Sequence, residues 1–258
     1  MPEGHTIHRA ARDHRRDLAG RAVAVSSPQG RFAAGAARLD GRVLVDVEAH
    51  GKHLFYRWAG GNGSGDDTLH VHLGLIGAFR SFCGPAPPPT AGTRLALHGG
   101  QVTVYLTGPL ACELTDPDEE ARLRARLGPD PLRRDADPTV AYAALQRRRI
   151  PIGAALLDQA VVAGVGNVFR AEALFVCGID PARPANSLDR AAFDALWATL
   201  VAMLRKGVRQ GRIATVGRDG RYVYQRAGEP CRRCGALVVG HTVAGRTLFS
   251  CPTCQRGT

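Results

Sequence analysis

The stretch CRRCGALVVGHTVAGRTLFSCPTC, from Cys231 to Cys254, begins and ends with a Cys-x-x-Cys pair. A structural zinc ion takes four ligands at the corners of a tetrahedron, and each pair supplies two thiolates. The pairs are separated by 16 residues, which is typical of such sites. Short strands are expected at 236–239 and 247–250. The stretch therefore predicts a zinc ribbon in which one structural Zn²⁺ is bound by Cys231, Cys234, Cys251 and Cys254.

The distribution of cysteines favours a bound metal over disulfide bonds. The chain has seven cysteines, and Cys83, Cys112 and Cys177 are scattered, as expected of small buried residues. The total is odd, and histidines and arginines interrupt any apolar signal peptide at the N-terminus. These features predict a reducing, cytoplasmic compartment. Two disulfides in the ribbon remain the alternative, and they would conflict with that compartment.

Positive charge is concentrated near the C-terminus. The formal net charge is +11, and residues 205–258 contain 11 basic and two acidic side chains. Such a block suits a polyanion such as nucleic acid, with an arginine-rich solvated surface as the alternative interpretation. A hydrophobic share of 45% excludes a disordered chain. The sequence has no run of about 18 apolar residues, so we expect no membrane partner.

The first 128 residues are predicted to form a helix followed by short strands. The helix is expected over 6–18. Residues 42–48 alternate strictly, which predicts a strand with Val43, Val45 and Val47 on one face. Further strands are expected at 53–58, 69–73, 78–82, 94–98 and 102–106. Short strands separated by turns predict an antiparallel β-sandwich or barrel over 1–128.

The second half of the chain is predicted to be helical. The proline-rich residues 129–138 read as a linker between domains. Helical patterns follow at 139–148, 152–160, 167–177 and 188–207, with the turn VVAGVG before Asn167. This arrangement predicts a helix–turn–helix domain over 139–224, followed by the ribbon over 225–258. The expected fold class is therefore α+β.

Pro2 and Glu3 stand at the amino terminus. Removal of Met1 would expose the secondary amine of proline, and an α-amino group with a pKa near 8 is partly neutral at pH 7. A neutral amine can attack an electrophilic carbon and form an iminium, which is an electron sink. Glu3 could then move protons. Taken alone, the motif is more often just a proline that precedes a helix.

Three further features carry candidate residues. Lys52 is one of only two lysines among 34 basic residues and follows a predicted hairpin turn, where a solvated lysine is the ordinary interpretation. Asn167 opens a helix, whose free amides suit phosphate, and it could also cap that helix. His70 and His72 share a strand face, where hydrogen bonding is favoured over metal binding.

Seven motifs follow one another in a fixed order. They are Met1-Pro-Glu3, Gly51-Lys-His53, His72-Leu-Gly-Leu-Ile-Gly77, Leu127-Gly-Pro-Asp-Pro-Leu132, the segment Leu156–Asn167, Gly228-Glu-Pro-Cys-Arg-Arg-Cys234 and the segment Gly245–Gln255. With these motifs in this order, the chain resembles the formamidopyrimidine-DNA glycosylase / endonuclease VIII family over essentially its full length.

The resemblance implies a β-sandwich domain, a helix–two-turn–helix domain and a zinc ribbon, with DNA in the cleft between them. It implies a bifunctional DNA glycosylase and abasic-site lyase of base excision repair, which extrudes a damaged base from the duplex. Pro2 would attack C1′, expel the base and form the iminium, while Glu3 would protonate the opening sugar. Elimination on both sides of the sugar would then leave a one-nucleotide gap.

The same resemblance implies roles for residues that bind DNA. Lys52 would contact a phosphate and assist base release, while Asn167 and Arg246 would grip the phosphates beside the extruded nucleotide. Glu172 matches an acidic position of the family. The expected partner is damaged double-stranded DNA. The expected protein is a monomer in the bacterial cytoplasm, associated with the nucleoid.

Several positions depart from the family pattern. His5-Thr6 replace a Pro-Glu pair, and Leu75 stands where the family has a methionine that wedges into the duplex. The segment Thr107–Cys112 lacks the Arg and Phe that fill the void and meet the orphaned cytosine in the formamidopyrimidine branch. Gly153 replaces a lysine of that branch, and 213–222 is short for a loop that caps flipped 8-oxoguanine.

These departures favour the endonuclease VIII-like branch, which acts on oxidised pyrimidines. Two alternatives remain open. One is the same mechanism acting on oxidised purines such as 8-oxoguanine or formamidopyrimidine. The other is a non-catalytic zinc-ribbon protein that binds DNA and in which Pro2 is incidental.

Overall fold

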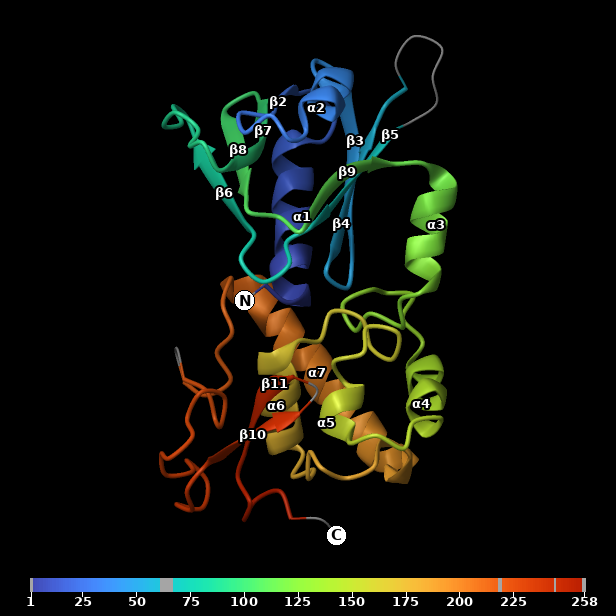
Figure 1. Ribbon diagram of the computed structural model, residues 1–258, viewed down its shortest axis with the longest axis vertical. Coiled ribbons are helices and arrows are strands. Elements are labelled where there is room, and N and C mark those ends of the chain that lie inside the picture. Colours follow the sequence, from blue (N-terminus) through green and yellow to red (C-terminus); the bar gives the residue numbers. More distant parts are fainter. Residues whose placement is uncertain (1, 61–66, 218–219, 244, 257–258) are drawn as a thin grey trace. The chain divides into compact units, whose positions relative to one another are not determined.

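The chain forms two compact units, Met1–Arg124 and Ala125–Thr258, each with its own hydrophobic core (Figure 1). The structure is a computed structural model, and it describes residues 2–60, 67–217, 220–243 and 245–256. Within these residues, no helix is both long enough and apolar enough to cross a membrane.

The first unit contains two antiparallel sheets. One is five-stranded, in the order β1-β3-β4-β5-β9, and comprises β1 (Arg21–Ala22), β3 (Val43–His50), β4 (His53–Trp58), β5 (Asp67–His72) and β9 (Ala111–Thr115). The other is four-stranded, in the order β2-β7-β8-β6, and comprises β2 (Ala24–Ser26), β7 (Thr93–Gly99), β8 (Val102–Thr107) and β6 (Ala78–Cys83). This arrangement confirms the predicted antiparallel sandwich.

Helix α1 (Gly4–Leu18) lies between the two sheets (Figure 1). Its His14 shares a 2.7 Å hydrogen bond with the hydroxyl of Tyr56 in β4. The same ring packs edge-on against Phe79 in β6, with 4.9 Å between ring centroids. One helical turn thus contacts both layers of the core, which explains why the sequence places a histidine on the helix's buried face.

Two helices of the first unit were not predicted, α2 (Ala33–Leu39) and α3 (Pro117–Ala125). Helix α2 is a short alanine-rich segment that buries only Ala36 and Leu39, so it has almost no apolar periodicity. Helix α3 did carry a signal. Asp116 and Glu119 exchange side-chain-to-backbone hydrogen bonds at its start, which is a capping box.

The predicted common face of Val43, Val45 and Val47 is wrong. The register between β3 and β4 shifts between Leu44 and Asp46, and a bulge of this kind turns the following side chains to the opposite face. Leu44 and Val47 are therefore fully buried, whereas Val43 and Val45 are 41% and 51% exposed.

The second unit contains the helices α4 (Pro138–Gln146), α5 (Ile152–Ala155), α6 (Asn167–Val176) and α7 (Arg190–Gln210), with a short 3₁₀ turn at Ala185–Ser187. The helix predicted over 152–160 ends at Ala155 because the next residues form turns. Asp158 accepts a hydrogen bond from the backbone of Ala160. Gln159 bonds the backbone of Leu157, Gly164 and Val165. These side chains hold the two turns that lead to Asn167.

The ribbon consists of β10 (Val239–Val243) paired antiparallel with β11 (Arg246–Ser250). The first strand begins three residues later than the start predicted at 236. The isolated bridge between Pro230 and Leu237 precedes it. Leu248 of the ribbon is fully buried in a cluster with Val168 and Phe175 of α6. The ribbon is thus part of the core of the second unit.

Candidate functional site

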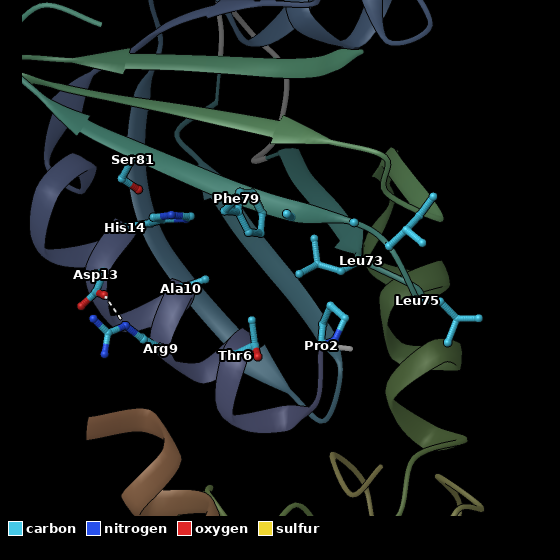
Figure 2. Close-up of a pocket in the computed structure, with 13 residues that line it drawn as sticks. Pro2, Thr6, Arg9, Ala10, Asp13, His14, Leu73, Leu75, Phe79 and Ser81 are labelled. Carbon is cyan, nitrogen blue, oxygen red and sulfur yellow. Dashed lines mark ion pairs between the residues drawn. The ribbon is translucent and has the colours of Figure 1, made fainter. Parts of the chain in front are cut away.

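Pro2 lies just before α1 and lines a cavity of about 530 Å³ in the first unit (Figure 2). Leu73 and Leu75 line the same end of the cavity. The neighbouring Glu3 is completely buried. Its backbone carbonyl accepts the first hydrogen bond of α1, from the N–H of Thr6 at 2.9 Å. Glu3 therefore stands where the helix dipole favours a negative charge.

The other end of the cavity is polar and is lined by Arg9, Asp13, His14 and Ser81. Nε of Arg9 lies 3.5 Å from a carboxylate oxygen of Asp13. Burial lowers the pKa of His14 to about 4, so this ring is neutral at pH 7. The cavity thus has an apolar end at Pro2 and Leu75 and a polar end at Arg9, Asp13, His14 and Ser81.

His5 and Thr6 occupy the positions where the family pattern has Pro-Glu. Thr6 lines the cavity. His5 is 5% exposed, and burial, with the nearby positive charges, lowers its pKa to about 4. Among the described residues that line the cavity, the one carboxylate is that of Asp13. A second N-terminal acid is thus replaced by a neutral hydroxyl.

Lys52 lies in the tight turn between β3 and β4 and is half-buried. The turn is made by Gly51, whose φ of +59° is left-handed and therefore suits glycine. Burial and neighbouring histidines lower the pKa values of His53 and His72, and the positive charge of Lys52 makes a smaller contribution in the same direction. Lys52 therefore stands close to a group of imidazoles on the five-stranded sheet.

Leu75 belongs to a group of three exposed apolar side chains carried by two loops. Leu75 is 59% exposed, Ile76 84% and Leu110 75%. The backbone N–H of Leu110 donates to the carbonyl of His72 at 2.8 Å. A Cβ atom added at Gly74 would lie 2.9 Å from Cβ of Leu110. The loops 73–77 and 107–110 are thus in contact, and together they present an apolar tip.

Asn167 begins α6 in the second unit, directly after the N-cap residue Gly166, so it does not cap the helix. Its Oδ1 accepts two hydrogen bonds from the guanidinium of Arg170, at 2.9 and 2.6 Å. Its Nδ2 donates to the carbonyl of Thr247 at 3.0 Å. Both ends of the amide are therefore fixed, one by α6 and one by the ribbon.

Arg170 is a completely buried arginine. Besides bonding Asn167, it donates to the carbonyl of Gly153 at 2.6 Å. A Cβ at Gly153 would lie 2.9 Å from Leu248 and 3.1 Å from the carbonyl of Pro181. A side chain at the position where the formamidopyrimidine branch has a lysine would therefore require Leu248 and the carbonyl of Pro181 to shift in this protein.

Glu172, two residues further along α6, is also completely buried. Its carboxylate accepts hydrogen bonds from the backbone N–H groups of Tyr222, Val223 and Tyr224, at 2.7 to 2.9 Å. The hydroxyl of Thr215 also donates to it. Glu172 therefore fixes the segment that joins α7 to the ribbon.

The four cysteines of the ribbon have the geometry of a metal site. Their sulfur atoms all lie within 4.8 Å of one another. Sγ of Cys231 is 3.9 Å from that of Cys254, and Sγ of Cys234 is 3.5 Å from that of Cys251. Tetrahedral Zn–S bonds of about 2.3 Å place the sulfurs roughly 3.8 Å apart. A disulfide would need about 2.05 Å, so the donor set fits zinc.

Arg246 is the first residue of β11 and pairs in register with Val243 of β10. It immediately precedes Thr247, whose carbonyl bonds Asn167. Asn167 and Arg246 are therefore brought together by the packing of α6 against the ribbon. The sequence alone placed them 79 residues apart.

Three family models match the chain. The formamidopyrimidine-DNA glycosylase N-terminal domain matches residues 1–109, and its helix–two-turn–helix domain matches residues 127–218. A zinc finger found in these glycosylases and in isoleucyl-tRNA synthetases matches residues 228–257. A protein of Mycobacterium bovis named "Endonuclease 8 1" is 47% identical, covering 99% of this chain and 100% of the relative.

The chain belongs to the formamidopyrimidine-DNA glycosylase and endonuclease 8 family.

Other members of the family are also similar over the full length. "Endonuclease 8 2" of Mycobacterium bovis is 36% identical, and a formamidopyrimidine-DNA glycosylase of Magnetococcus marinus is 31% identical. Each match covers 99% of this chain and 100% of the relative. A solved complex of the Lactococcus lactis glycosylase with damaged DNA has a TM-score of 0.83 at 23% identity, over 99% of this chain and 100% of that one. At this identity, the similarity to the Lactococcus lactis structure shows a shared fold.

Zinc as the cofactor and the predicted fold class are confirmed for this member of the family.

Sequence reasoning missed three residues that lie near candidate residues, Ile76 and Leu110 near Leu75 in the first unit and Arg170 near Asn167 in the second. Ile76 and Leu110 were not singled out, although an exposed apolar residue in a glycine-containing loop is a usable signal. Arg170 was not singled out either, because nothing in the local sequence shows that an arginine in a helix is buried.

Proposed function

We propose that this protein removes oxidised pyrimidines from duplex DNA through an iminium formed by Pro2, and then cleaves the strand by β,δ-elimination. As a member of its family, it is a bifunctional DNA glycosylase and abasic-site lyase of base excision repair. The observation that carries the proposal is that Pro2 lines a cavity of about 530 Å³, with the buried Glu3 next to it.

The proposed chemistry begins when Met1 is removed and the amine of Pro2 becomes free. The proline nitrogen attacks C1′ of the damaged nucleotide, and the bond from C1′ to the base breaks. Glu3 gives a proton to the ring oxygen as the sugar opens. The resulting iminium draws electrons from C2′, so the 3′ phosphate and then the 5′ phosphate are eliminated.

We propose that Lys52, Asn167 and Arg246 hold the DNA backbone. Two features support this role for Asn167 and Arg246. Asn167 stands at the start of a helix, where free amides favour phosphate, and Arg246 lies within the basic block of residues 205–258. Cys231, Cys234, Cys251 and Cys254 would hold the zinc that keeps Arg246 in place, and the zinc takes no part in the chemistry.

The preference for pyrimidines is supported by the apolar tip formed by Leu75, Ile76 and Leu110. Extruding a base costs a few kcal/mol, and less for a damaged base that stacks poorly. An oxidised pyrimidine that has lost its aromaticity needs only a modest wedge, whereas 8-oxoguanine still stacks and pairs well. The side chains of the tip offer bulk without hydrogen bonds to the partner base. Relatives named endonuclease 8 give independent support.

We further propose that the protein works as a monomer on damaged double-stranded DNA in the bacterial cytoplasm, associated with the nucleoid. The proposed domains are a catalytic domain at 1–128, a linker at 129–138, a DNA-binding domain at 139–224 and the ribbon at 225–258. The net charge of +11 suits a polyanionic partner.

A panel of duplexes that each carry one lesion tests this function. Thymine glycol or 5-hydroxyuracil should be excised faster than 8-oxoguanine opposite cytosine, and the products should be one-nucleotide gaps with phosphate ends. Tenfold faster excision of 8-oxoguanine, about 1.4 kcal/mol in barrier, would favour the oxidised-purine alternative. Binding without any cleavage would favour the non-catalytic one.

A further inference from the structure

A groove of about 660 Å³ lies in the second unit, between α7 and the segment that leads into α4. Trp197, Val201 and Arg205 of α7 line it, and their spacing of four residues places them along one face of the helix. Arg133 and Arg134 line it from the segment. The groove therefore combines an apolar surface with positive charge from both of its walls.

Both walls are held by the core of the second unit. Phe193 is buried in that core, and Trp197 and Leu132 pack against the same cluster. The segment is also fixed by the buried Asp130, whose side chain accepts from the N–H of Leu132 and whose carbonyl accepts from that of Arg133, both at 2.9 Å. A partner would thus meet a preformed surface, which lowers the entropic cost of binding.

The positive charge of the groove is only partly balanced. Arg134 and Arg205 are exposed, and neither forms a hydrogen bond or ion pair within the part of the chain that the structure describes. Arg133 bonds the carboxylate of Asp135 twice, at 2.9 and 2.8 Å. No carboxylate is among the described residues that line the groove. An anionic ligand would therefore meet at least two guanidinium groups that have no competing acid.

The lining suits an acidic protein segment better than a nucleic acid. Bases stack on aromatic rings that have an open face, whereas Trp197 is half-buried, with its ring centroid 6.2 Å from that of Phe193. Apart from tryptophan and arginine, the described lining consists of alanine, valine and proline. It has no side-chain amide or hydroxyl to bond a base edge. An apolar side chain would cover this surface without leaving a polar group unpaired.

The groove is distinct from the sites described above. It shares no residue with the cavity at Pro2 or with the four ribbon cysteines. The hydroxyl of Thr199 accepts from the thiol of Cys177, at the end of α6, at 3.4 Å. Thr199 is about 160° around α7 from Val201. The groove therefore opens on a different side of α7 from the one that meets the end of α6.

We propose that this groove binds an acidic segment of a partner protein. One apolar side chain of the segment lies against Trp197 and Val201, and the flanking carboxylates bind Arg134 and Arg205. Guanidinium groups match carboxylates through paired hydrogen bonds. Trp197 and Arg205 are roughly 12 Å apart along the helix, a length that about four extended residues span. The ligand is thus a short motif in which acidic residues flank one large apolar residue.

The probe is a fluorescein-labelled peptide with two aspartates on each side of one leucine, titrated with the full chain and followed by anisotropy. Binding should saturate and should weaken as salt is added. Alanine in place of leucine should weaken it about tenfold, because the apolar contact is lost. Asparagine in place of the aspartates should weaken it by a similar factor. Bound peptide should also protect Trp197 from acrylamide quenching, since Trp58 is already fully buried.

Two variants locate the site with little risk to folding, because both positions are exposed. Arg134→Glu reverses a charge in the groove and should weaken peptide binding about tenfold. Ala202→Phe fills the groove without changing the charge, and it should weaken the leucine peptide to the level of the alanine peptide. Arg149→Glu is the matched control, since it makes the same charge change at an exposed arginine outside the lining. It should change peptide affinity less than about twofold.

Three results would overturn the inference. The first is that wild-type protein shows no saturable binding of the leucine peptide. The second is equal weakening by Arg134→Glu and Arg149→Glu, which would reduce the effect to net charge. The third is a single-stranded oligothymidylate that displaces the peptide and loses affinity in Arg134→Glu alone, which would assign the groove to nucleic acid. Because the assay contains no damaged DNA, its outcome is independent of the chemistry proposed for Pro2.

Discussion

The side-chain amide of Asn167 donates a hydrogen bond to the backbone carbonyl of Thr247 at 3.0 Å. The other end of the same amide is bonded twice by the buried Arg170. Two candidate phosphate-binding residues from distant parts of the chain, Asn167 and Arg246, therefore share one rigid support. Their relative position is set by α6 and the ribbon together, so a change in either element should disturb both.

Replacement of Arg170 by methionine tests this support. The variant keeps the bulk but loses the hydrogen bonds to Asn167 and to Gly153. We expect the free energy of unfolding to fall by about 2–4 kcal/mol, and affinity for a duplex with an abasic-site analogue to fall about tenfold. Chemical denaturation and fluorescence anisotropy measure the two effects. Arg190→Met, which removes an exposed pair with Asp194, should cost less than about 1 kcal/mol. Equal losses in the two variants would contradict the supporting role.

Zinc is expected at one ion per chain, and its removal should unfold the ribbon. A Cys234→Ser variant, which lacks one of the four ligands, should contain less zinc and bind DNA weakly. The core of the first unit, which contains Trp58, should stay folded. Cys83→Ser is the control, since that thiol is exposed and lies outside the ribbon. Metal analysis of freshly purified protein decides the matter, and a protein without zinc that still binds DNA would contradict the assignment.

The apolar tip can be tested by truncating Leu110. Leu110→Ala should slow excision of thymine glycol from duplex DNA about fivefold, because about 1 kcal/mol of contact with the opened stack is lost. Excision from a single strand, where no stack has to be opened, should be unaffected. Val45→Ala removes a similarly exposed apolar side chain from β3 and serves as the control. If Leu110→Ala slows both substrates equally, the residue does not act as a wedge.

The first unit should lose stability in mild acid. The pKa values of His5 and His14 are lowered from 6.5 to about 4, mainly by burial. The unfolded chain therefore takes up protons below pH 6.5 that the folded chain does not, and stability falls with pH by about 1.4 kcal/mol per unit for each ring. The stabilising contribution is complete above pH 6.5 and is lost as the pH falls toward 4. In urea titrations, His14→Gln should reduce this slope by one proton. An unchanged slope would show that His14 is protonated in the folded state.

The sequence predicted those parts of the fold that have a local signal. The cysteine pairs predicted the ribbon, and turn residues with short alternating segments predicted the sandwich. The bulge at Val45 was not predicted, because it depends on how β3 pairs with β4. The end of α5 was not predicted, because Asp158 and Gln159 bond nearby backbone groups instead of continuing the helix.

The candidate functional residues also differ in whether a local sequence signal identifies them. Pro2, Glu3 and the cysteines stand in recognisable motifs. Leu110 and Arg170 depend on contacts between segments that are far apart in the sequence. Leu110 meets Gly74 across two loops, and Arg170 meets Gly153 between two helices. Such contacts leave no trace in local composition, so only the folded chain identifies these residues.

The central claim is that the processed Pro2 amine is the nucleophile, and borohydride trapping tests it most directly. Wild-type protein mixed with a thymine glycol duplex and borohydride should give a covalent protein–DNA complex, because reduction fixes the iminium. Pro2→Gly, or a variant that retains Met1, should form little of this complex while still binding the duplex. Peptide mapping should locate the attached sugar on residue 2. Normal trapping and turnover by protein that retains Met1 would contradict the account.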